Sequence, residues 1–391
     1  MRRVTILGST GSIGRSTVAV LTEAPDFEFA VEALVGGDNV GLLIEQARAL
    51  RPSVAVIASE KHLDALRTGL AGTGIQAQAG HSAVIDAAAR PSDWVMSAIT
   101  GAAGLKPTLA AVARGAKVAL ANKECLVCAG SLFMDAARTH GATLLPVDSE
   151  HNAIFQVLGR PQDVEKLILT ASGGPFRTHS LESMRKASAA EALDHPNWAM
   201  GQKISIDSAT MMNKGLELIE AAYLFGVPEE RIEIVVHPQS IVHSLVSYRD
   251  GSVLAQLGAP DMRIPIAHAL AWPDRIQTTA PRLDLAAIGN LSFEAPDLTR
   301  FPALEVARGA MKMGQGAPTA LNAANEVAVR AFLDGQIAFL DIAALVTETL
   351  EALVAHGLIA AGAEPRTFED VHTLDETARR VAVEHRQRFS S

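Results

Sequence analysis

The sequence predicts an α/β protein with three parts: an N-terminal doubly wound, Rossmann-like domain, a central α+β domain and a C-terminal helical bundle. Short apolar strands alternate with helical patterns over roughly the first 150 residues. The pattern then becomes mixed and includes a hairpin signal at Asp250-Gly251. Segments with helical periodicity end the chain. A length of 391 residues fits two or three domains of ordinary size.

The N-terminal part is expected to form a parallel sheet. Its predicted strands are residues 4–8, 29–35, 54–58, 95–100, 118–122 and 143–147. Helical patterns occupy residues 13–23, 40–50 and 105–113. Because the strands are apolar without interruption, we expect both faces of the sheet to be covered by helices.

The rest of the chain is expected to contain antiparallel strands, a linker and a helical end. Predicted strands are residues 167–170, 232–236, 244–248 and 252–257, with a helix at 208–225. Prolines recur and periodicity fades from 273 to 302, and helical patterns follow at 304–311, 318–334, 342–356 and 374–389. The expected domains are therefore 1–147, 148–272 and 301–391, with a linker at 273–300.

Composition narrows the class of protein. A formal net charge of −9 argues against nucleic-acid binding, which needs a basic surface. No apolar run reaches the roughly 20 residues of a membrane span. Two cysteines indicate a reducing compartment, and Met1-Arg2-Arg3-Val4 leads directly into a strand without room for a signal peptide. We expect a cytoplasmic protein that binds neither nucleic acid nor membranes.

A glycine loop, Gly8-Ser9-Thr10-Gly11-Ser12-Ile13-Gly14, joins the first predicted strand to the first helix. Such a loop lets backbone N–H groups approach a pyrophosphate at the helix N-terminus. The alternative is a tight turn without a ligand. The second strand ends without an acid before Asp38, which leaves space for a 2′-phosphate, with Arg15 as the nearest cation. This favours NADPH and leaves NADH open.

Three carboxylates suggest a metal site. Asp148 and Glu150 are expected on an extended segment, where positions two apart point the same way. Glu217 is expected on a helix face with Asn213 and Lys214. An all-oxygen ligand set suits Mg²⁺ or Mn²⁺. The alternative for the first pair is ordinary charge at a strand end.

Hydroxyl, amide and ammonium groups suggest a phosphate site. Ser172-Gly173-Gly174 follows a predicted strand, and Ser208, Asn213 and Lys214 lie near the start of a helix. The alternative is a glycine turn plus a helix cap. The irregular segment 195–202 is either a lid over a ligand or a surface loop.

The remaining polar candidates are assigned to the interior. His237 and His243 lie in apolar surroundings and are interpreted as satisfied core histidines. Cys125 and Cys128 have no second C-x-x-C and no suitable histidine pair, so we interpret them as small residues opening a helix.

The motifs taken together point to a known family. They are the glycine loop, Asn122-Lys123-Glu124, Asp148-Ser149-Glu150-His151-Asn152, the Ser-Gly-Gly turn, His195-Pro196-Asn197-Trp198, the string from Asp207 to Glu217, His237-Pro238-Gln239-Ser240 and Leu321-Asn322-Ala323-Ala324-Asn325-Glu326. The chain resembles the 1-deoxy-D-xylulose 5-phosphate reductoisomerases of isoprenoid (isoprene) biosynthesis, essentially from end to end. The string from Asp207 to Glu217 is the most specific motif, and the glycine loop is the least.

The resemblance implies a V-shaped homodimer that is an NADPH-dependent oxidoreductase using Mg²⁺ or Mn²⁺, with Co²⁺ as a further candidate. NADPH would contact Thr10, Gly11, Ser12, Ile13, Gly37, Asn39, Asn122, Glu124 and Gly201. The metal would be held by Asp148, Glu150 and Glu217. The substrate would contact Lys123, Ser149, Glu150, Ser172, His195, Ser208, Asn213, Lys214 and Glu217, with residues 195–202 as its flap.

Three departures from the family pattern are visible. Asp38 stands where relatives commonly have a basic residue, and Cys125 replaces a usual serine. The stretch between Gln156 and Leu167 is shorter than in some relatives.

The resemblance also implies a reaction, in which a sugar phosphate is rearranged to a branched aldehyde and reduced to 2-C-methyl-D-erythritol 4-phosphate. Lys123, Glu150 and Glu217 are the expected catalytic residues. Bond cleavage with rejoining and direct migration both stay open. Two other functions remain: an NADP-linked reductase without rearrangement, and a non-catalytic NADPH-binding regulator.

Overall fold

The structure is a computed structural model that describes residues 1–24, 27–314, 316–359 and 365–389. The chain divides into two compact units, each described by itself below. The first comprises Met1–Cys125, Phe133–Asn152 and Asp261–Pro281. The second comprises Leu126–Leu132, Ala153–Pro260 and Arg282–Ser391. The boundaries expected from the sequence stay predictions; the segment Asp261–Pro281, expected in the central domain and linker, is grouped here with the N-terminal strands.

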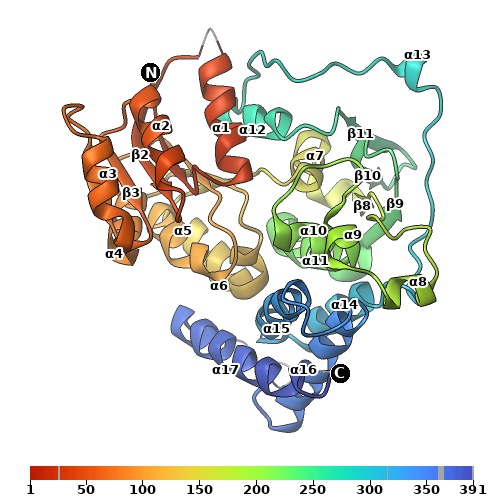
Figure 1. The fold of residues 1–391 in the computed structure, drawn as a ribbon. Coiled ribbons are helices and arrows are strands. Elements are labelled where there is room, and N and C mark those ends of the chain that lie inside the picture. Colours follow the sequence, from red (N-terminus) through yellow and green to blue (C-terminus); the bar gives the residue numbers. More distant parts are fainter. Residues whose placement is uncertain (25–26, 315, 360–364, 390–391) are drawn as a thin grey trace. The chain divides into compact units, whose positions relative to one another are not determined.

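The first unit contains a seven-stranded parallel sheet (Figure 1). Its strands are β1 (Arg2–Leu7), β2 (Phe29–Gly36), β3 (Val54–Ile57), β4 (Gln76–Ala79), β5 (Trp94–Ser97), β6 (Lys117–Leu120) and β7 (Thr143–Pro146). They lie in the order β4-β3-β2-β1-β5-β6-β7. Every residue of β3 and β5 is buried, as expected for strands covered on both faces. The doubly wound prediction is confirmed.

The sequence prediction missed β4. This strand has the sequence Gln-Ala-Gln-Ala, lies at the edge of the sheet and alternates between exposed and half-buried residues. It contains no β-branched or aromatic residue, so it lacks the composition that marks a strand.

Helices connect the strands of this unit. The connecting helices are α1 (Ser12–Glu23), α2 (Val40–Leu50), α3 (Leu63–Gly69), α4 (His81–Ala88) and α5 (Leu105–Val112), with 3-10 turns η1 (Glu60–His62) and η2 (Ala102–Gly104). A further helix of this unit, α12 (Arg263–Ala271), comes from later in the chain and connects no strands. Two more helices, α6 (Glu124–Thr139) and α7 (Ser149–Val157), each have residues in both units. Cys125 and Cys128 are buried near the start of α6, which confirms their assignment as interior residues.

The second unit contains a four-stranded sheet with the order β11-β10-β8-β9. Its strands are β8 (Val164–Ala171), β9 (Ile232–Val236), β10 (Val242–Tyr248) and β11 (Val253–Leu257). β8 and β9 are parallel, whereas β10 is antiparallel to both β8 and β11. The predicted hairpin is confirmed: Gly251 has a φ of 88°, and its N–H donates to the Tyr248 carbonyl.

The helices of the second unit include α11 (Met212–Phe225), which packs against β8 and β9, and the C-terminal bundle. They are α8 (Leu181–Arg185), α9 (Ala189–Leu193), α10 (Gln202–Ala209), α11 (Met212–Phe225), α13 (Leu285–Ile288), α14 (Ala303–Met313), α15 (Gly316–Leu333), α16 (Asp341–Ala355) and α17 (Phe368–Arg386), with 3-10 turns η3 (Pro161–Asp163) and η4 (Glu229–Arg231). The four helices predicted at the C-terminus are confirmed as α14 to α17. Among the described residues, none of the helices has both the length and the hydropathy to span a bilayer.

The predicted helix 208–225 is wrong in one respect, because the chain forms two helices there. α10 ends at Ala209 and α11 begins at Met212. Met211 between them has a φ of 61°, a left-handed conformation that interrupts α-helical hydrogen bonding. The break changes the direction of the chain between Ser208 and Asn213, two residues of the predicted phosphate site.

Candidate active site

The glycine loop lies between β1 and α1, where the strand order of the sheet reverses. Neighbours of β1 are β2 on one side and β5 on the other, so the carboxyl end of β1 is a topological switch point, the usual place for a nucleotide in this fold. Gly8 has a φ of 85°, and a Cβ added at Gly14 would overlap the Gly8 carbonyl. Gly11 caps α1 without a side-chain hydrogen bond. The first N–H groups of α1 are therefore suited to a pyrophosphate.

The neighbouring predicted cofactor residues also lie at carboxyl ends of strands. Asn39 caps α2, accepting the Leu42 N–H at 3.1 Å, and an added Cβ at Gly37 would meet no atom within 4 Å. Asn122 follows β6, accepts the Cys125 N–H at 3.0 Å and donates to the Gly101 carbonyl at 3.0 Å. An alanine side chain therefore has room at Gly37 but not at Gly14, so substitutions at the two positions should have different effects.

We expect Gly14→Ala and Gly37→Ala to separate loop shape from ligand contact. Gly14→Ala should displace the loop backbone and raise the KM for NADPH by roughly 100-fold, because the N–H groups lose their alignment. Gly37→Ala should leave the melting temperature unchanged. It should lower the affinity for NADPH only if Gly37 faces the cofactor. Fluorescence titration of NADPH and thermal unfolding measure both effects. Wild-type NADPH affinity in Gly14→Ala would contradict the assignment of the loop.

Lys123 and Asp148 form an ion pair at the carboxyl ends of β6 and β7. These strands are parallel neighbours, so residues that follow them meet at one edge of the sheet. Both side chains are largely buried, with 7% and 14% of their surfaces exposed. Asp148 forms the last position before α7, and Ser149 and Glu150 open that helix.

The expected extended conformation of Asp148-Ser149-Glu150 is therefore wrong. β7 ends at Pro146, and only two residues separate it from the start of α7 at Ser149. The two carboxylates nevertheless come close: one oxygen of Asp148 and one of Glu150 lie within 4.8 Å of each other. They do so because the chain turns sharply into the first helical turn, where acidic side chains are also favoured by the helix dipole.

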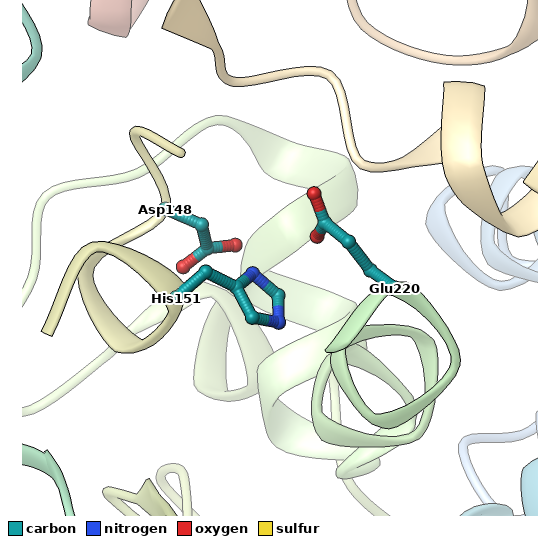
Figure 2. Close-up of side chains that lie close together, drawn as sticks. All are labelled: Asp148, His151 and Glu220. Carbon is teal, nitrogen blue, oxygen red and sulfur yellow. The ribbon is translucent and has the colours of Figure 1, made fainter. Parts of the chain in front are cut away.

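Electrostatics at this turn favour ionised Asp148. Burial alone would raise the pKa of the Asp148 carboxyl, but the Lys123 ammonium, His151 and a hydrogen bond with Glu150 together lower this pKa well below its usual range. Figure 2 shows Asp148 and His151 side by side at the start of α7. Ser149 Oγ donates to Glu150 Oε2 at 2.5 Å. The carboxylates of Asp148 and Glu150, with the Ser149 hydroxyl oxygen beside them, are a donor set that fits a hard divalent cation.

The third predicted ligand lies on α11 in the second unit. Glu217 is fully buried and accepts hydrogen bonds from Asn213 Nδ2, at 2.5 Å, and from Lys214 Nζ. The two donors lie one turn before it, which confirms that the three residues share a helix face. Glu220, drawn in Figure 2, follows one turn later on the same helix. Burial of a carboxylate with an ammonium partner is costly and is typical of functional sites.

The Ser-Gly-Gly turn follows β8 and contacts α10. Gly173 and Gly174 have φ values of 84° and 67°, and an added Cβ at Gly174 would lie 2.7 Å from the Ser208 carbonyl oxygen. Glycine at this position lets the turn and α10 approach closely. Ser172 and Ser208, two predicted phosphate ligands, therefore lie on adjacent segments of the same unit.

His195 belongs to the same group of residues. Its Nδ1 accepts the backbone N–H groups of Asn197, at 3.2 Å, and Trp198, at 3.1 Å. Because a backbone N–H can only donate, the ring proton is on Nε2, which donates to Ser172 Oγ at 2.9 Å. Burial lowers the pKa of His195 to about 4. A neutral His195 thus holds a serine that also accepts the Gly174 N–H.

Three family models match the chain in consecutive stretches. A model described as 1-deoxy-D-xylulose 5-phosphate reductoisomerase matches residues 4–130, and its C-terminal domain matches 144–225. A DXP reductoisomerase C-terminal domain matches 257–381. A protein of that name from Caulobacter vibrioides is 59% identical over 98% of this chain and 96% of its own length. The chain belongs to the 1-deoxy-D-xylulose 5-phosphate reductoisomerase family.

Other members of the reductoisomerase family agree in sequence and structure. The protein from Rhodospirillum centenum is 60% identical over 98% of this chain and 94% of its own length. A solved reductoisomerase from Zymomonas mobilis in complex with NADPH is 51% identical, with a TM-score of 0.91 over 98% of this chain and 99% of that one. A solved complex with NADPH, fosmidomycin and magnesium is 45% identical, with a TM-score of 0.94 over 99% and 98%.

Sequence reasoning missed two basic residues beside the proposed reductoisomerase cofactor loop. Lys61 Nζ lies 3.4 Å from Asp38 Oδ1, and His62 Nε2 lies 3.9 Å from the same oxygen. Both belong to η1, which follows β3, the strand next to β2. The signal was available, since polar residues after adjacent parallel strands meet at one edge. The Lys61 ammonium offsets the negative charge of Asp38 where a 2′-phosphate is expected.

Buried histidines give this reductoisomerase a predictable pH dependence. Burial lowers the pKa of His243 to about 4, with lesser contributions from His237 and Lys214 and an opposing one from the Ala259 and Gly258 backbone. Below pH 6.5 the unfolded chain binds a proton that the folded chain binds only near pH 4. The free energy of unfolding therefore falls as the pH is lowered from 6.5 to 4.

Between pH 7 and pH 4.5 the free energy of unfolding should fall by about 2 kcal/mol less in His243→Gln than in the wild type. Urea unfolding at the two pH values measures it, with wild-type protein as the reference. His195 and His268, whose pKa values burial also lowers to about 4, titrate in both proteins and so cancel. Equal losses in the variant and the wild type would contradict the prediction.

Proposed function

We propose that the chain converts 1-deoxy-D-xylulose 5-phosphate and NADPH to 2-C-methyl-D-erythritol 4-phosphate with a divalent metal ion. The observation that supports this most strongly is family membership over nearly the whole chain, with relatives at about 60% identity. The glycine loop at the switch point and the buried carboxylates supply the residue types that this chemistry needs. The reaction belongs to non-mevalonate isoprenoid biosynthesis.

NADPH is proposed to bind along the carboxyl edge of the parallel sheet. Its pyrophosphate would lie at the N-terminus of α1, where the N-cap residue Gly11 has no side chain to occupy the first N–H groups. Lys61 would add positive charge near the 2′-phosphate, with the His62 ring beside it. NADPH supplies hydride to the aldehyde. The proposed contact residues are Thr10, Gly11, Ser12, Ile13, Gly37, Asn39, Asn122, Glu124 and Gly201.

The metal ligands are proposed to be Asp148, Glu150 and Glu217, with Mg²⁺ as the ion. Mg²⁺ is supported by solved relatives described in complex with magnesium, and Mn²⁺ and Co²⁺ are alternatives with the same ligand preferences. A bound cation polarises the substrate ketone and acidifies the neighbouring hydroxyl. It also relieves the repulsion between the adjacent Asp148 and Glu150 carboxylates.

The substrate phosphate is proposed to bind beside the Ser-Gly-Gly turn. Ser172, Ser208, Asn213 and Lys214 would donate hydrogen bonds to it, since all four offer N–H or O–H groups. His195 is neutral, and its Nε2–H faces Ser172. Asn197 donates to the Pro238 carbonyl at 2.7 Å and to Ser240 Oγ at 2.9 Å, which anchors the start of the proposed flap, residues 195–202.

Near the reacting carbons, Lys123 would stabilise negative charge and hold a proton at Nζ. Its ion pair with Asp148 keeps the ammonium at the carboxyl edge of the sheet. Glu150 and Glu217 complete the proposed catalytic residues, and Ser149 would bind a substrate hydroxyl. Flap closure would exclude water from the aldehyde.

A cytoplasmic homodimer is proposed as the working state. The edge strand β11 supports a second copy as partner, since Val253 and Leu254 are about half exposed and the strand pairs only with β10 among the described strands. Light scattering on purified protein tests this, and a monomeric mass at micromolar concentration would exclude the dimer. The proposed domain division is 1–147 for NADPH, 148–272 for catalysis and 301–391 for the helical bundle.

The decisive experiment measures NADPH oxidation with 1-deoxy-D-xylulose 5-phosphate and Mg²⁺, and identifies the product by mass spectrometry and NMR. We expect a branched product and loss of turnover after thorough chelation. Unbranched product, or turnover that survives chelation, would indicate a simple reductase. NADPH binding without turnover of this substrate would indicate a regulator.

A further inference from the structure

The motif Leu321-Asn322-Ala323-Ala324-Asn325-Glu326 belongs to the family pattern but has no part in the chemistry proposed above. It lies in the middle of α15, far along the chain from every proposed ligand. Asn322 and Asn325 are both fully buried. Burying an amide is costly unless hydrogen bonds compensate it, so the partners of these side chains indicate what the motif does.

Asn325 is bonded to a buried carboxylate on α10. Its Nδ2 donates to Asp207 Oδ1 at 2.7 Å, and Asp207 is 1% exposed. Lys203 Nζ lies 2.8 Å from Asp207 Oδ2, one turn earlier on the same helix. Within the described part of the chain, Asn325 Oδ1 has no hydrogen-bond partner. The Asn325 amide therefore hydrogen-bonds Asp207. The orientation of this amide is fixed, because a carboxylate only accepts and so must face Nδ2.

This contact joins α10 to α15 at the residue next to Ser208. Asp207 directly precedes Ser208, whose carbonyl is the group that Gly174 approaches closely. α15 is itself fixed, because Glu326 pairs with Arg379 of α17 at 2.8 Å, and Arg379 pairs with Asp375 at 2.6 Å. Polar contacts of α15 on either side thus connect the C-terminal bundle to α10, whose last turn contains Ser208.

We propose that Asn325 and Asp207 are positioning residues for the substrate phosphate, which they serve by fixing the end of α10 where Ser208 lies. The inference rests on the proposed function, which assigns Ser208 to the phosphate. It makes the C-terminal helices part of substrate recognition. Breaking a charge-assisted hydrogen bond of this kind should change phosphate affinity by about tenfold.

The test compares Asn325→Leu with Asn322→Leu. Asn322 is equally buried on the same helix, but its Nδ2 donates to Glu326 of α15 itself, at 3.1 Å, so it is a matched control. We expect Asn325→Leu to raise the KM for 1-deoxy-D-xylulose 5-phosphate about tenfold and to leave the KM for NADPH unchanged. Asn322→Leu should change neither. An unchanged substrate KM in Asn325→Leu, or equal increases in both variants or for both substrates, overturns the proposal.

Hydrogen exchange of the ligand-free protein gives a readout that does not depend on activity. Amides of residues 202–209 should exchange faster in Asn325→Leu than in Asn322→Leu. If Asn325→Leu does not fold, Asn325→Ser, whose side chain is too short to reach Asp207, should show the same two changes. Wild-type exchange in α10 of these variants overturns the positioning role. Absence of turnover in the wild type would instead refute the proposed function, while the exchange comparison still reports on α10.

Discussion

Glu217→Gln should lower kcat/KM by roughly 1,000-fold and abolish the stimulation by Mg²⁺. The substitution keeps the size of the side chain but removes the charge of a fully buried carboxylate. Asn213 and Lys214 donate to different oxygens of Glu217, so the single amide oxygen of glutamine replaces only one of these two acceptors. Lewis-acid stabilisation by a metal ion is worth several kcal/mol, which corresponds to this factor. Steady-state kinetics over a range of Mg²⁺ concentrations, with metal binding measured by calorimetry, check both effects.

Glu229→Gln is the matched control for this experiment. Glu229 is a buried carboxylate in the same unit, and its partners are Arg308 and Lys312 rather than proposed site residues. We expect it to lower the melting temperature and leave the Mg²⁺ dependence unchanged. Near-normal turnover of Glu217→Gln with Mg²⁺, or equal losses in both variants, would remove Glu217 from the metal site.

The sequence predicted those parts of the fold where composition and local pattern agree. Mostly apolar runs revealed strands of the parallel sheet such as β3, which is apolar throughout, because burial on both faces favours apolar residues. The Asp-Gly hairpin was predicted because its turn needs a positive φ at Gly251. β4 was missed because an exposed edge strand of Gln and Ala has neither property.

Conformations set by tertiary contacts were not predictable in this way. Asp148 and Glu150 were expected two apart on a strand, yet the same pair comes together at a helix start. Met211 has a left-handed φ, which sequence analysis would expect at a glycine but not at a methionine. The bond from Asn325 to Asp207 spans 118 positions, and no local pattern encodes such a contact. The residue types of the site were therefore predictable, but the backbone that presents them was not.

Lys123→Met should lower kcat by roughly 100- to 1,000-fold with a small effect on NADPH affinity, because an ammonium aimed at developing charge acts mainly in the transition state. Methionine preserves the length of the buried stem but leaves Asp148 without its ammonium partner. The pKa of Asp148, now held low largely by Lys123, should rise, so the acid limb of the pH–rate profile should move to higher pH.

Lys123→Arg separates charge from position. Arginine keeps the positive charge beside Asp148 but replaces a compact ammonium with a planar guanidinium, so the acid limb should stay near its wild-type position while kcat remains low. Stopped-flow measurement of NADPH oxidation distinguishes a slower chemical step from slower product release. If Lys123→Met retained wild-type kcat, the ion pair with Asp148 would be purely structural, and the proton held at Nζ would have to be assigned to another residue.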